Sequence, residues 1–572
     1  SYGTAQNTRL TADLNKALSE TLGVRLNVMK QDGEVAGRDE VEIDRMGIAG
    51  AVSFGIGTNI RTSINYERYE QDDVPDGGIP VIGLDTYYNT GWTRASNGTT
   101  SYNASTAALA NGAKVDSSNF YGTADDYEKV TTDVFTGKIE HDFNDKTSLT
   151  NTLRYGKSKI DSLLTQSATI SANNSTNPSD WTATRSGQAR WQENEILSNA
   201  TNVKTSFNTA SLVHNVSSGF DITIENQKTK ARTVNGTYPA ANLYNPDYSQ
   251  RTTNLSLDET GAKNFGETKT IGAYAFDSIN IGEKFMVIGG GRLDKFETTT
   301  DTTTIATATN PGGGVPVGTK IATDLENSGT LKSYKLGFVY KPLENGSVYI
   351  SYADSQLPPG AANFTLNSSA TNQANSDMDP QEANTVELGT KWDFLNNKLS
   401  FTSAIYKTIN ENEVINLGDS TNTDYQQIGE REVKGIELGV AGEITDAWSV
   451  TAGIAKTMTE ITKGSKSTAY DQQTGVAYII DTTGTTLPYT PEWTATLWSS
   501  YNITKELTLG GGARYIGEML SGSTEEQVRS TNNRILSVDS YIIYDAMASY
   551  KISKNLTTQL NVYNITDEEY AA

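Results

Sequence analysis

The links between strand-like runs restrict the fold of this chain more than any other feature. About 20 runs alternate apolar and polar residues, and the links between them alternate between short and long. The short links lie near 58 and at 144–146, 282–284, 343–346, 395–397, 445–446, 504–506 and 553–554. The long polar links lie at 32–44, 71–128, 159–188, 229–265, 298–328, 354–383, 409–425, 460–486 and 518–536. Because every second link is short, every second strand end should lie on the same side of the sheet.

The alternation within each run predicts a sheet with one apolar face. In "TVELGTKWDF", Val386 and Leu388 share one face, and Glu387 and Lys391 share the other. A β-sandwich alternates too, but Greek-key links give no reason for loops to be sorted by length. A mean hydropathy of -0.48 does not exclude a membrane barrel, because lipid-facing and lumen-facing residues average out. The prediction is an all-β, large antiparallel up-and-down transmembrane β-barrel, with residues 1–572 as a single domain.

The composition excludes several classes of protein. The chain has no cysteine and only two isolated histidines, which removes thiol chemistry and a histidine metal centre. A net charge of -22 argues against a nucleic-acid partner. The 29 tyrosines and 7 tryptophans argue against disorder. The acidic stretch at 375–380 lacks the glycine order of a calcium loop. We therefore expect no catalytic residues, no metal site and no enzyme.

Seven segments, in order, resemble the barrel of TonB-dependent outer-membrane siderophore receptors. They are "RLNVMKQDGEVAGRD", "GAYAFDSINIGEKFMVIGGGRLDKFE", "GSVYISYADSQLPPG", "DPQEANTVELGTKWDFLNNKLSFTSAIYKT", "REVKGIELGVAGEITDAWSVTAGIA", "LPYTPEWTATLWSSYNI" and "LNVYNITDEEY". "QDDVPDGGIP" resembles the point where catecholate-type receptors leave a strand for a surface loop, although relatives often have Tyr where this chain has Gly77. In that stretch Asp72, Asp73 and Asp76 favour turns, and Gly77 and Gly78 allow positive φ.

The resemblance implies a 22-stranded barrel with an N-terminal plug domain, in the outer membrane of a Gram-negative bacterium. On this basis the runs correspond to strands 2 to 21, and the first strand, the last strand and the plug are missing. The natural chain is then expected to be longer at both ends, because an unpaired strand edge is costly in lipid. The expected partners are a ferric siderophore, outer-membrane lipid and lipopolysaccharide, and TonB through the missing N-terminal region. No cofactor is expected, because iron arrives inside the siderophore chelate.

A ferric tris-catecholate is an anion, and the chain is acidic. Local arginines and aromatic rings must therefore outweigh the average field at the mouth. The candidate ligand-binding residues are Tyr87, Tyr88, Trp92 and Arg94 in one long loop, Trp181, Arg185, Arg190 and Trp191 in the next, and Arg431 and Arg514 near the upper wall. The alternatives are aromatics that hold loops together and arginines that pair with carboxylates or lipopolysaccharide. The candidate plug-facing lumen residues are Glu387, Lys391, Glu437, Glu443 and Asp545, together with Arg514; simple hydration of a wide lumen is the alternative.

Three functions remain open at this point. The first is active import of a ferric siderophore, of catecholate type. The second is TonB-dependent import of another ligand, such as a hydroxamate siderophore, cobalamin, a sugar or another metal chelate. The third is a passive porin or an adhesin, which a plug sequence upstream would exclude.

Overall fold

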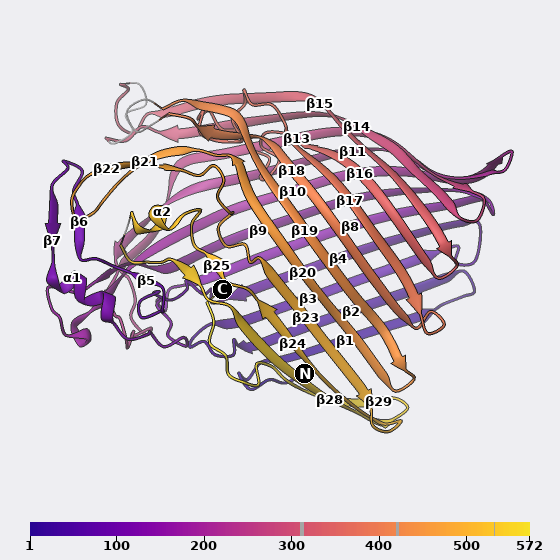
Figure 1. The fold of residues 1–572 in the computed structure, drawn as a ribbon, viewed down its shortest axis with the longest axis horizontal. Helices are drawn as coiled ribbons and strands as arrows, with labels where there is room; N and C mark the ends of the chain where they lie inside the picture. The colour runs from indigo at the N-terminus through magenta and orange to yellow at the C-terminus, as the bar shows by residue number, and fades with distance from the viewer. Residues whose placement is uncertain (309–313, 419–422, 531, 572) are drawn as a thin grey trace.

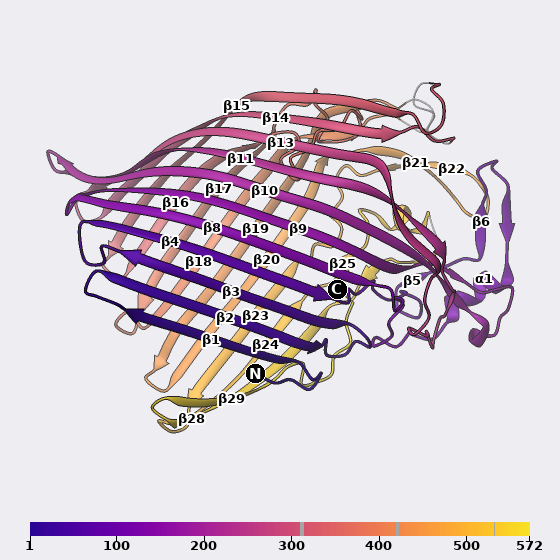
Figure 2. The ribbon, with the colours of Figure 1, turned by 180° about the vertical axis from the view of Figure 1, so that it is seen from behind.

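The fold is an antiparallel β-sheet curled into a barrel. The computed structural model describes residues 1–308, 314–418, 423–530 and 532–571, and within them the main sheet has 21 strands. Figures 1 and 2 show two facing walls of tilted strands, with the early strands in one wall and the late strands in the other. All ladders of the main sheet are antiparallel, and apart from the pairing of the short β12 with β10 they join wall strands that follow one another along the chain, so the predicted fold class is confirmed.

Twenty strands of the main sheet form the wall, and the two-residue β12 (Ala241–Asn242) is added at its rim. The first ten wall strands are β1 (Thr8–Ala17), β2 (Leu22–Glu34), β3 (Glu42–Phe54), β4 (Ile60–Asp73), β8 (Tyr127–Asn144), β9 (Thr147–Ser171), β10 (Thr182–Thr209), β11 (Leu212–Thr237), β13 (Thr253–Ile281) and β14 (Phe285–Ile305). The other ten are β15 (Lys320–Leu343), β16 (Gly346–Leu357), β17 (Gln381–Phe394), β18 (Leu399–Asn416), β19 (Tyr425–Thr445), β20 (Trp448–Lys463), β23 (Trp493–Asn502), β24 (Leu507–Ile516), β28 (Tyr541–Ser553) and β29 (Leu556–Val562).

The remaining elements are short and lie in the long loops. They are β5 (Tyr87–Tyr88), β6 (Trp92–Arg94), β7 (Thr100–Tyr102), α1 (Ala104–Ala108), η1 (Leu109–Asn111), η2 (Pro178–Asp180), β21 (Lys466–Tyr470), β22 (Ala477–Asp481), β25 (Met519–Leu520), α2 (Glu525–Arg529), β26 (Arg534–Ile535) and β27 (Ser537–Val538). Neither α-helix of the described residues is long and apolar enough to cross a membrane.

Short and long connections are sorted onto opposite ends of the barrel, as the sequence predicts. Residues 145–146 connect β8 to β9, and residues 446–447 connect β19 to β20. At the other end, residues 74–126 connect β4 to β8, and residues 464–492 connect β20 to β23. In Figure 1 the loop elements α1, β6 and β7 lie at the left and the short turns at the right.

Several predicted loop boundaries were wrong, because the strands continue well into them. The link expected at 159–188 shrinks to 172–181, since β9 and β10 pair from Thr147 with Thr205 up to Ser171 with Thr182. Likewise, the link expected at 229–265 is limited to residues 238–252 between β11 and β13. Part of the links at 298–328 and 409–425 lies outside the described residues. The extended parts of β9 and β10 are covered by loops instead of lipid, so the regular alternation disappears although the backbone ladder continues.

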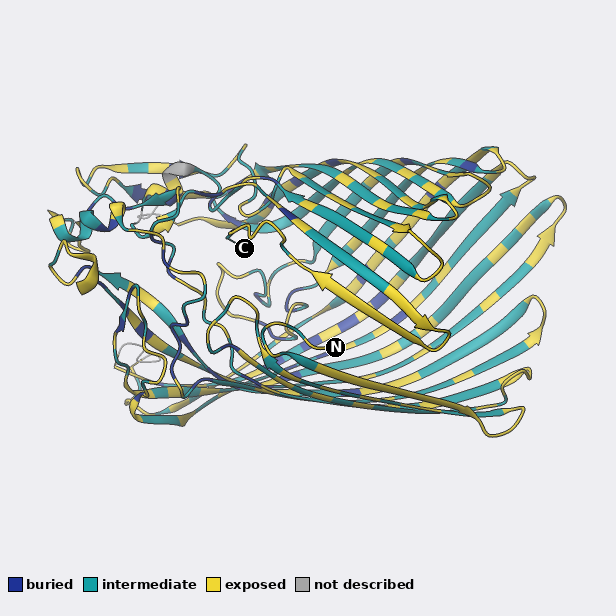
Figure 3. Ribbon diagram, turned by 90° about the horizontal axis from the view of Figure 1, so that it is seen from below, coloured by how far each residue is buried: buried dark blue, intermediate teal, exposed yellow. Residues whose placement is uncertain are grey.

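The outer face of the wall carries an apolar band. Leu388 on β17 is 44% exposed, and Ile405, Ile436 and Ile454 on the following strands are exposed to a similar degree. A soluble protein rarely exposes so wide an apolar surface, whereas a membrane barrel directs it to lipid. Figure 3 shows exposed and less exposed residues alternating along the strands. These residues define the lipid-facing side of each strand. The residues that alternate with them along the strand face the lumen.

A cluster of buried apolar residues lies among the loops and not in the membrane region. It joins residues from the 74–126 loop, from 172–183 and from 241–243, and its members are Ile82, Leu109, Val115, Tyr121, Ala172, Trp181, Ala183, Ala241 and Leu243. We call these nine residues the loop core. Three connections distant in sequence are therefore fixed to one another at the end of β9, β10 and β11.

The stretch 71–80 ends β4 at Asp73. Asp73 is buried, pairs with Arg45 at 2.6 Å and accepts the amide hydrogen bond of Asp44. It therefore stabilises the pairing of β4 with β3 and not the turn that follows. Asp76 accepts the amide of Gly78, which has the expected positive φ of 78°. Gly77 does not have a positive φ; it is required because a Cβ there would collide with the carbonyl oxygen of Thr165.

Candidate ligand-binding site at the mouth

The 74–126 loop, the longest connection, holds four of the predicted ligand residues. After β5, the hairpin of β6 and β7 projects from it, and α1 follows with Asn103 as its N-cap, accepting the amides of Ser105 and Thr106. Gly91, with φ of 73°, allows the chain to turn between β5 and β6. The loop is therefore an ordered structure with its own hydrogen bonds.

Tyr87 and Tyr88 contact the loop between β24 and β28. They pair with Ile535 and Arg534 as a two-stranded sheet of β5 and β26. The Tyr87 hydroxyl donates to Asn533 Oδ1 at 2.6 Å, and the guanidinium of Arg529 lies 5.0 Å from the centroid of the Tyr88 ring. This region therefore combines aromatic rings with an arginine, as a ligand site requires. In the structure, however, these side chains contact one another.

Trp92 and Arg94 lie on the β6 strand of the same hairpin. Trp92 packs against Tyr102 with ring centroids 5.3 Å apart. Arg94 lies over the ring of Tyr470 at 3.7 Å, and Tyr470 belongs to the 464–492 loop. The Nε atom of Arg94 is buried and has no hydrogen-bond partner among the described residues.

The structure corrects the assignment of Trp181 and Arg185. Trp181 is 1% exposed and is a member of the loop core, so no ligand reaches its ring. Arg185 is on β10, is 6% exposed, and donates to the carbonyl oxygens of Tyr121 at 2.8 Å and Asp247 at 2.9 Å. The alternative role, holding loops together, applies to both residues.

Arg190 and Trp191 also lie on β10 instead of in a loop, and they point to opposite sides. Trp191 shares the lipid-facing side with Leu197, beyond the apolar band, with the ammonium groups of Lys230 at 4.7 Å and Lys159 at 5.7 Å from its ring. It therefore lies outside the lumen, which corrects its assignment. Arg190 faces the lumen, is exposed, and donates to Gln192 at 2.6 Å.

Arg431 and Arg514 lie on other parts of the wall. Arg431 on β19 pairs with Glu413 at 2.6 Å, and Arg514 on β24 is exposed on the lumen side. The structure therefore keeps Tyr87, Tyr88, Trp92 and Arg94 within one short segment of the 74–126 loop, and it distributes Arg190, Arg431 and Arg514 around the wall.

The predicted plug-facing residues lie on the lumen side of their strands. The Tyr349 hydroxyl donates to Glu387 at 2.6 Å, and Lys391 lies 5.5 Å from the centroid of the same ring. Glu437 and Glu443 share the lumen side of β19, opposite Ile436 and Leu438. Asp545 accepts the amide of Asn564 at 2.8 Å. Contact of these five residues with a plug stays a prediction.

Burial perturbs two titratable groups in the loop region. Burial in the loop core raises the pKa of Tyr121 to about 12, and its hydroxyl donates to the Leu243 carbonyl. Burial also raises the pKa of Asp126, although hydrogen bonds from Thr165 and Thr123 oppose that shift. Both groups connect the 74–126 loop to its neighbours.

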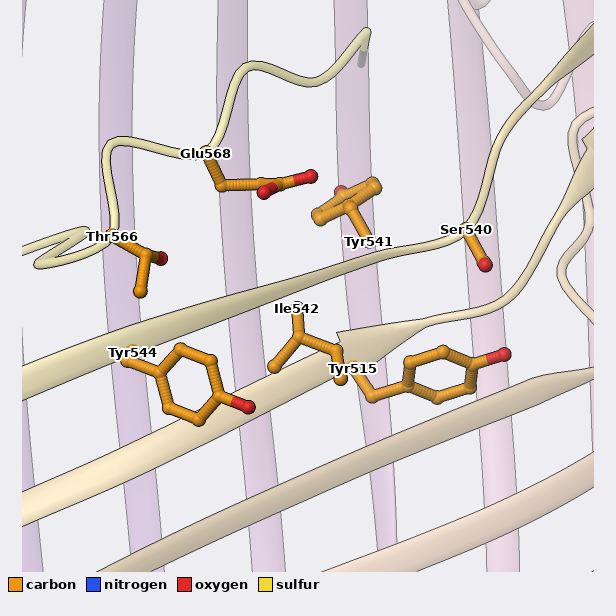
Figure 4. Close-up of a pocket in the computed structure, with 7 residues that line it drawn as sticks. All are labelled: Tyr515, Ser540, Tyr541, Ile542, Tyr544, Thr566 and Glu568. Atoms are coloured by element: carbon orange, nitrogen blue, oxygen red, sulfur yellow. The ribbon is translucent and has the colours of Figure 1, made fainter.

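Two pockets in the described residues do not coincide with the predicted ligand set. One has a volume of about 350 Å³, and Figure 4 shows it between β28 and the segment after β29. Its lining residues are Tyr515, Ser540, Tyr541, Ile542, Tyr544, Thr566 and Glu568. The other, of about 590 Å³, includes Arg292, Lys332 and Tyr334. No group of three or more potential metal ligands occurs in the described part of the chain.

The sequence did not reveal the residues that the 74–126 loop contacts across the mouth. Asn532, Asn533 and Tyr470 are among them, and they stand in polar loops with no periodic signal. Only the aromatic residues themselves, unusual in such loops, could have drawn attention to these segments.

The fold and the mouth define an outer-membrane receptor barrel whose long loops fold over its opening. The chain belongs to the TonB-dependent receptor family: residues 65–565 match the family model described as "TonB dependent receptor-like, beta-barrel". The resemblance drawn from the sequence is thereby confirmed, and the barrel is a protein of the Gram-negative outer membrane and not an enzyme.

Characterised relatives and solved structures agree with this family. The chain is 40% identical to the catecholate siderophore receptor Fiu of Escherichia coli K12, over 100% of this chain and 72% of Fiu. It is 32% identical to PiuA of Acinetobacter baumannii, a probable TonB-dependent siderophore receptor, over 99% of this chain and 72% of the relative. The crystal structure of E. coli Fiu in its closed form superposes with a TM-score of 0.88 and 38% identity, covering 100% of this chain and 77% of Fiu.

Proposed function

We propose that this chain forms the barrel of an active importer that captures a ferric catecholate siderophore at its loops and takes it through the outer membrane. The observation that carries the proposal is the 40% identity to the catecholate siderophore receptor Fiu along the whole chain. The importer draws energy from TonB, and residues 1–572 act as one barrel domain. Iron is cargo inside the chelate, so no resident cofactor is needed.

The chemistry of the mouth fits an anionic aromatic chelate. Arg190 and Arg514 present guanidinium groups to the lumen, and such groups form paired hydrogen bonds to catecholate oxygens. Tyr88, Trp92 and Arg94 supply rings and a stacked cation at the loop end. These groups overcome the repulsion expected from a chain with a net charge of -22.

We also propose that the outer face contacts lipopolysaccharide. Lys407 and Lys434 are directly opposite each other on β18 and β19, and both pair with the single carboxylate of Glu432. They stand on the lipid-facing side, next to Ile405 and Ile436, on the loop side of the apolar band. Each ammonium group has hydrogen-bond donors left over after its contact with Glu432, and these can bind a lipid phosphate.

Lipopolysaccharide contact is tested by the lipid that copurifies with the receptor. Lys407→Gln combined with Lys434→Gln should reduce bound lipopolysaccharide, measured by mass spectrometry of the extracted receptor. Lys398→Gln is the matched control, because Lys398 pairs with Asp446 at the short-turn end. Equal amounts in all three proteins would refute this contact.

Transport is tested by growth of an iron-starved Gram-negative strain that lacks its own catecholate receptors. The receptor should restore growth and uptake of radiolabelled ferric catecholate, and deletion of the tonB gene should abolish both. Growth on a ferric hydroxamate, cobalamin or a sugar, without growth on the catecholate, would instead favour a different ligand for the same barrel.

A further inference from the structure

One strand of the wall extends far beyond its neighbour on one side. β15, along the top of the molecule in Figure 1, pairs with β14 as far as Ile305 with Lys320. Its pairing with β16 ends much earlier, at Tyr334 with Asp354. Residues 320–333 therefore form a strand with one free side. We call this stretch the β15 edge.

The backbone groups on the free side of the β15 edge have no protein partner. Successive residues of a strand point their N–H and C=O groups alternately to its two sides. The amide of Lys332 donates to the side chain of Gln356 on β16 at 2.8 Å, whereas the amide of Lys341 donates to the carbonyl of Lys284, next to β14, at 2.7 Å. Even-numbered residues therefore point to the free side. Within the described ranges, no hydrogen bond reaches the backbone of these five from that side: Ala322, Asp324, Glu326, Ser328 and Thr330.

The free side begins where the outer apolar band ends. Leu336 and Tyr334 are exposed on the lipid-facing side, and Lys332 is the next residue on that side. A bare strand edge is costly in hydrocarbon, so β16 covers β15 as far as lipid reaches. Beyond the lipid, water satisfies the bare groups, and the edge remains a template on which another strand can pair.

A second long strand shows what a covered edge looks like. The pairing of β9 with β8 ends at Leu163 with Tyr127, so β9 also extends beyond its neighbour. There the 74–126 loop takes the place of a strand. The amide of Thr165 donates to Asp126 at 2.9 Å, and a Cβ at Gly77 would lie 2.4 Å from the carbonyl oxygen of Thr165. The β15 edge has no such cover among the residues that the structure describes.

The inner face of the β15 edge is occupied by the protein itself. Leu331 is 8% exposed, and Asn327 donates to the carbonyl of Ser376 at 2.8 Å, in the link between β16 and β17. The even-numbered side chains of the edge are exposed on the outer face. A partner can therefore reach the backbone of the edge and its outer face, but not its inner face.

The outer face beside the edge is acidic in its middle. Asp324 is directly opposite Asp301 of β14, and Glu297 is directly opposite Ser328. These three carboxylates and that of Glu326 are exposed, and none forms an ion pair within the described part of the chain. Like charges directly opposite each other repel, so added cations should stabilise this face.

The cations of this region lie at the two ends of the acidic stretch. Lys295 and Lys332 lie at its membrane end, and Lys320 lies at its far end. A strand that matches this pattern carries its positive charges in the middle.

A second copy of the receptor does not match the edge. Two receptors in one membrane have the same orientation, so their β15 strands can pair only in parallel. A two-fold pairing of this kind places Asp324 and Glu326 beside their own copies, and like charges then repel.

We propose that the β15 edge is a docking site for a cationic partner protein at the cell surface. The partner adds one extended strand antiparallel to β15, in the place that β16 leaves open. Lysine or arginine side chains at alternate positions of that strand lie on the outer face, beside Asp324 and Glu326. This interaction goes beyond import and does not depend on which cargo the barrel carries.

A synthetic strand tests the site on the intact receptor in lipid nanodiscs. The probe is a fluorescent eight-residue peptide of alternating lysine and threonine, and anisotropy measures its binding. Binding should slow hydrogen exchange at the amides of Asp324 and Glu326, and leave exchange unchanged at Thr323 and Leu325, which point to β14. No binding, or binding without this alternate protection, would overturn the proposal.

Two N-methylated peptides separate strand pairing from attraction by charge alone. In the antiparallel arrangement, the lysine residues lie opposite the even-numbered residues and point their amides at β15. Methylation of the lysine amides should abolish binding, whereas methylation of the threonine amides should leave it unchanged. Equal binding of the two methylated peptides would mean attraction by charge alone and would overturn the docking of a strand.

Receptor variants test the same contacts from the other side. Asp324→Asn with Glu326→Gln should weaken peptide binding about tenfold, and the difference should shrink at high salt. Ser328→Pro removes one donor from the free side, keeps the ladder to β14, and should weaken binding as well. Glu259→Gln is the matched control, because Glu259 lies on β13 and pairs with Lys230 at 2.8 Å. Equal Kd values in all of these receptors would overturn the site.

Discussion

The carboxylate of Asp126 accepts two hydrogen bonds from Thr165, one from its hydroxyl at 2.6 Å and one from its amide at 2.9 Å. Thr165 is 0% exposed, so a carboxylate that ends the 74–126 loop is held against β9 in a site closed to water. This contact has a predictable dependence on pH.

Burial raises the pKa of Asp126 above its ordinary value of 3.8, so the folded loop binds this proton more tightly than the unfolded chain does. The contribution of Asp126 to loop stability should therefore fall as pH rises from 3.8 through the raised pKa, and stay constant above it. Asp126→Asn removes this titration. The stability of the wild type relative to Asp126→Asn, measured by protease resistance of the loop, should increase as pH is lowered from 7 to 4. A ratio independent of pH would contradict the prediction.

Removal of the Trp181 side chain should loosen the loop core. A buried aromatic residue replaced by alanine loses about 3–5 kcal/mol through lost contacts and a cavity. Trp181→Ala should therefore make residues 74–126 sensitive to protease in whole cells, without loss of the barrel. Trp191→Ala is the matched control, because that ring lies on the outer face of β10. Equal loop sensitivity in the two variants would refute the burial argument.

Arg185→Lys keeps the charge but cannot serve the carbonyls of Tyr121 and Asp247 together. Hydrogen bonds to charged groups contribute about 1.5–3 kcal/mol, so the loss of one should destabilise the loops by roughly 2 kcal/mol. Faster hydrogen exchange at 121–126 and 238–252, with unchanged exchange in β17, would show this. Unchanged exchange at both loops would mean that the arginine is dispensable.

Arg190→Ala and Arg514→Ala should each weaken binding of ferric catecholate. The loss of a charge-assisted hydrogen bond of about 1.5–3 kcal/mol corresponds to roughly tenfold to a hundredfold in Kd, and the effect should shrink at high salt. Fluorescence quenching by the ferric chelate measures the change. Arg61→Ala is the control, because Arg61 pairs with Asp142 at the short-turn end. Equal Kd values in all three variants would remove these two arginines from the ligand set.

The wall could be predicted from the sequence because lipid imposes alternation on each strand. On β17, for example, the exposed apolar residues Val386 and Leu388 alternate with polar residues, so the side of the sheet that each residue faces can be predicted from the strand sequence alone. The upper parts of β9 and β10 could not be recognised, because loops from distant parts of the chain cover them instead of lipid, and such contacts impose no regular alternation on the strand. The site was harder still. Trp181 and Arg185 are buried by segments 60 residues or more away in sequence, so no local pattern distinguishes them from ligand-binding residues.

The unequal length of the strands has a consequence for where cargo is first met. β10 has 28 residues and β1 has 10. At about 3.3 Å per residue and a tilt near 40°, these lengths correspond to rises of roughly 70 Å and 25 Å, against an apolar layer of about 25 Å. One flank of the receptor therefore stands some tens of ångströms taller than the bilayer requires. A scarce nutrient can be intercepted there, within the sugar coat of the cell, before it reaches the lipid surface.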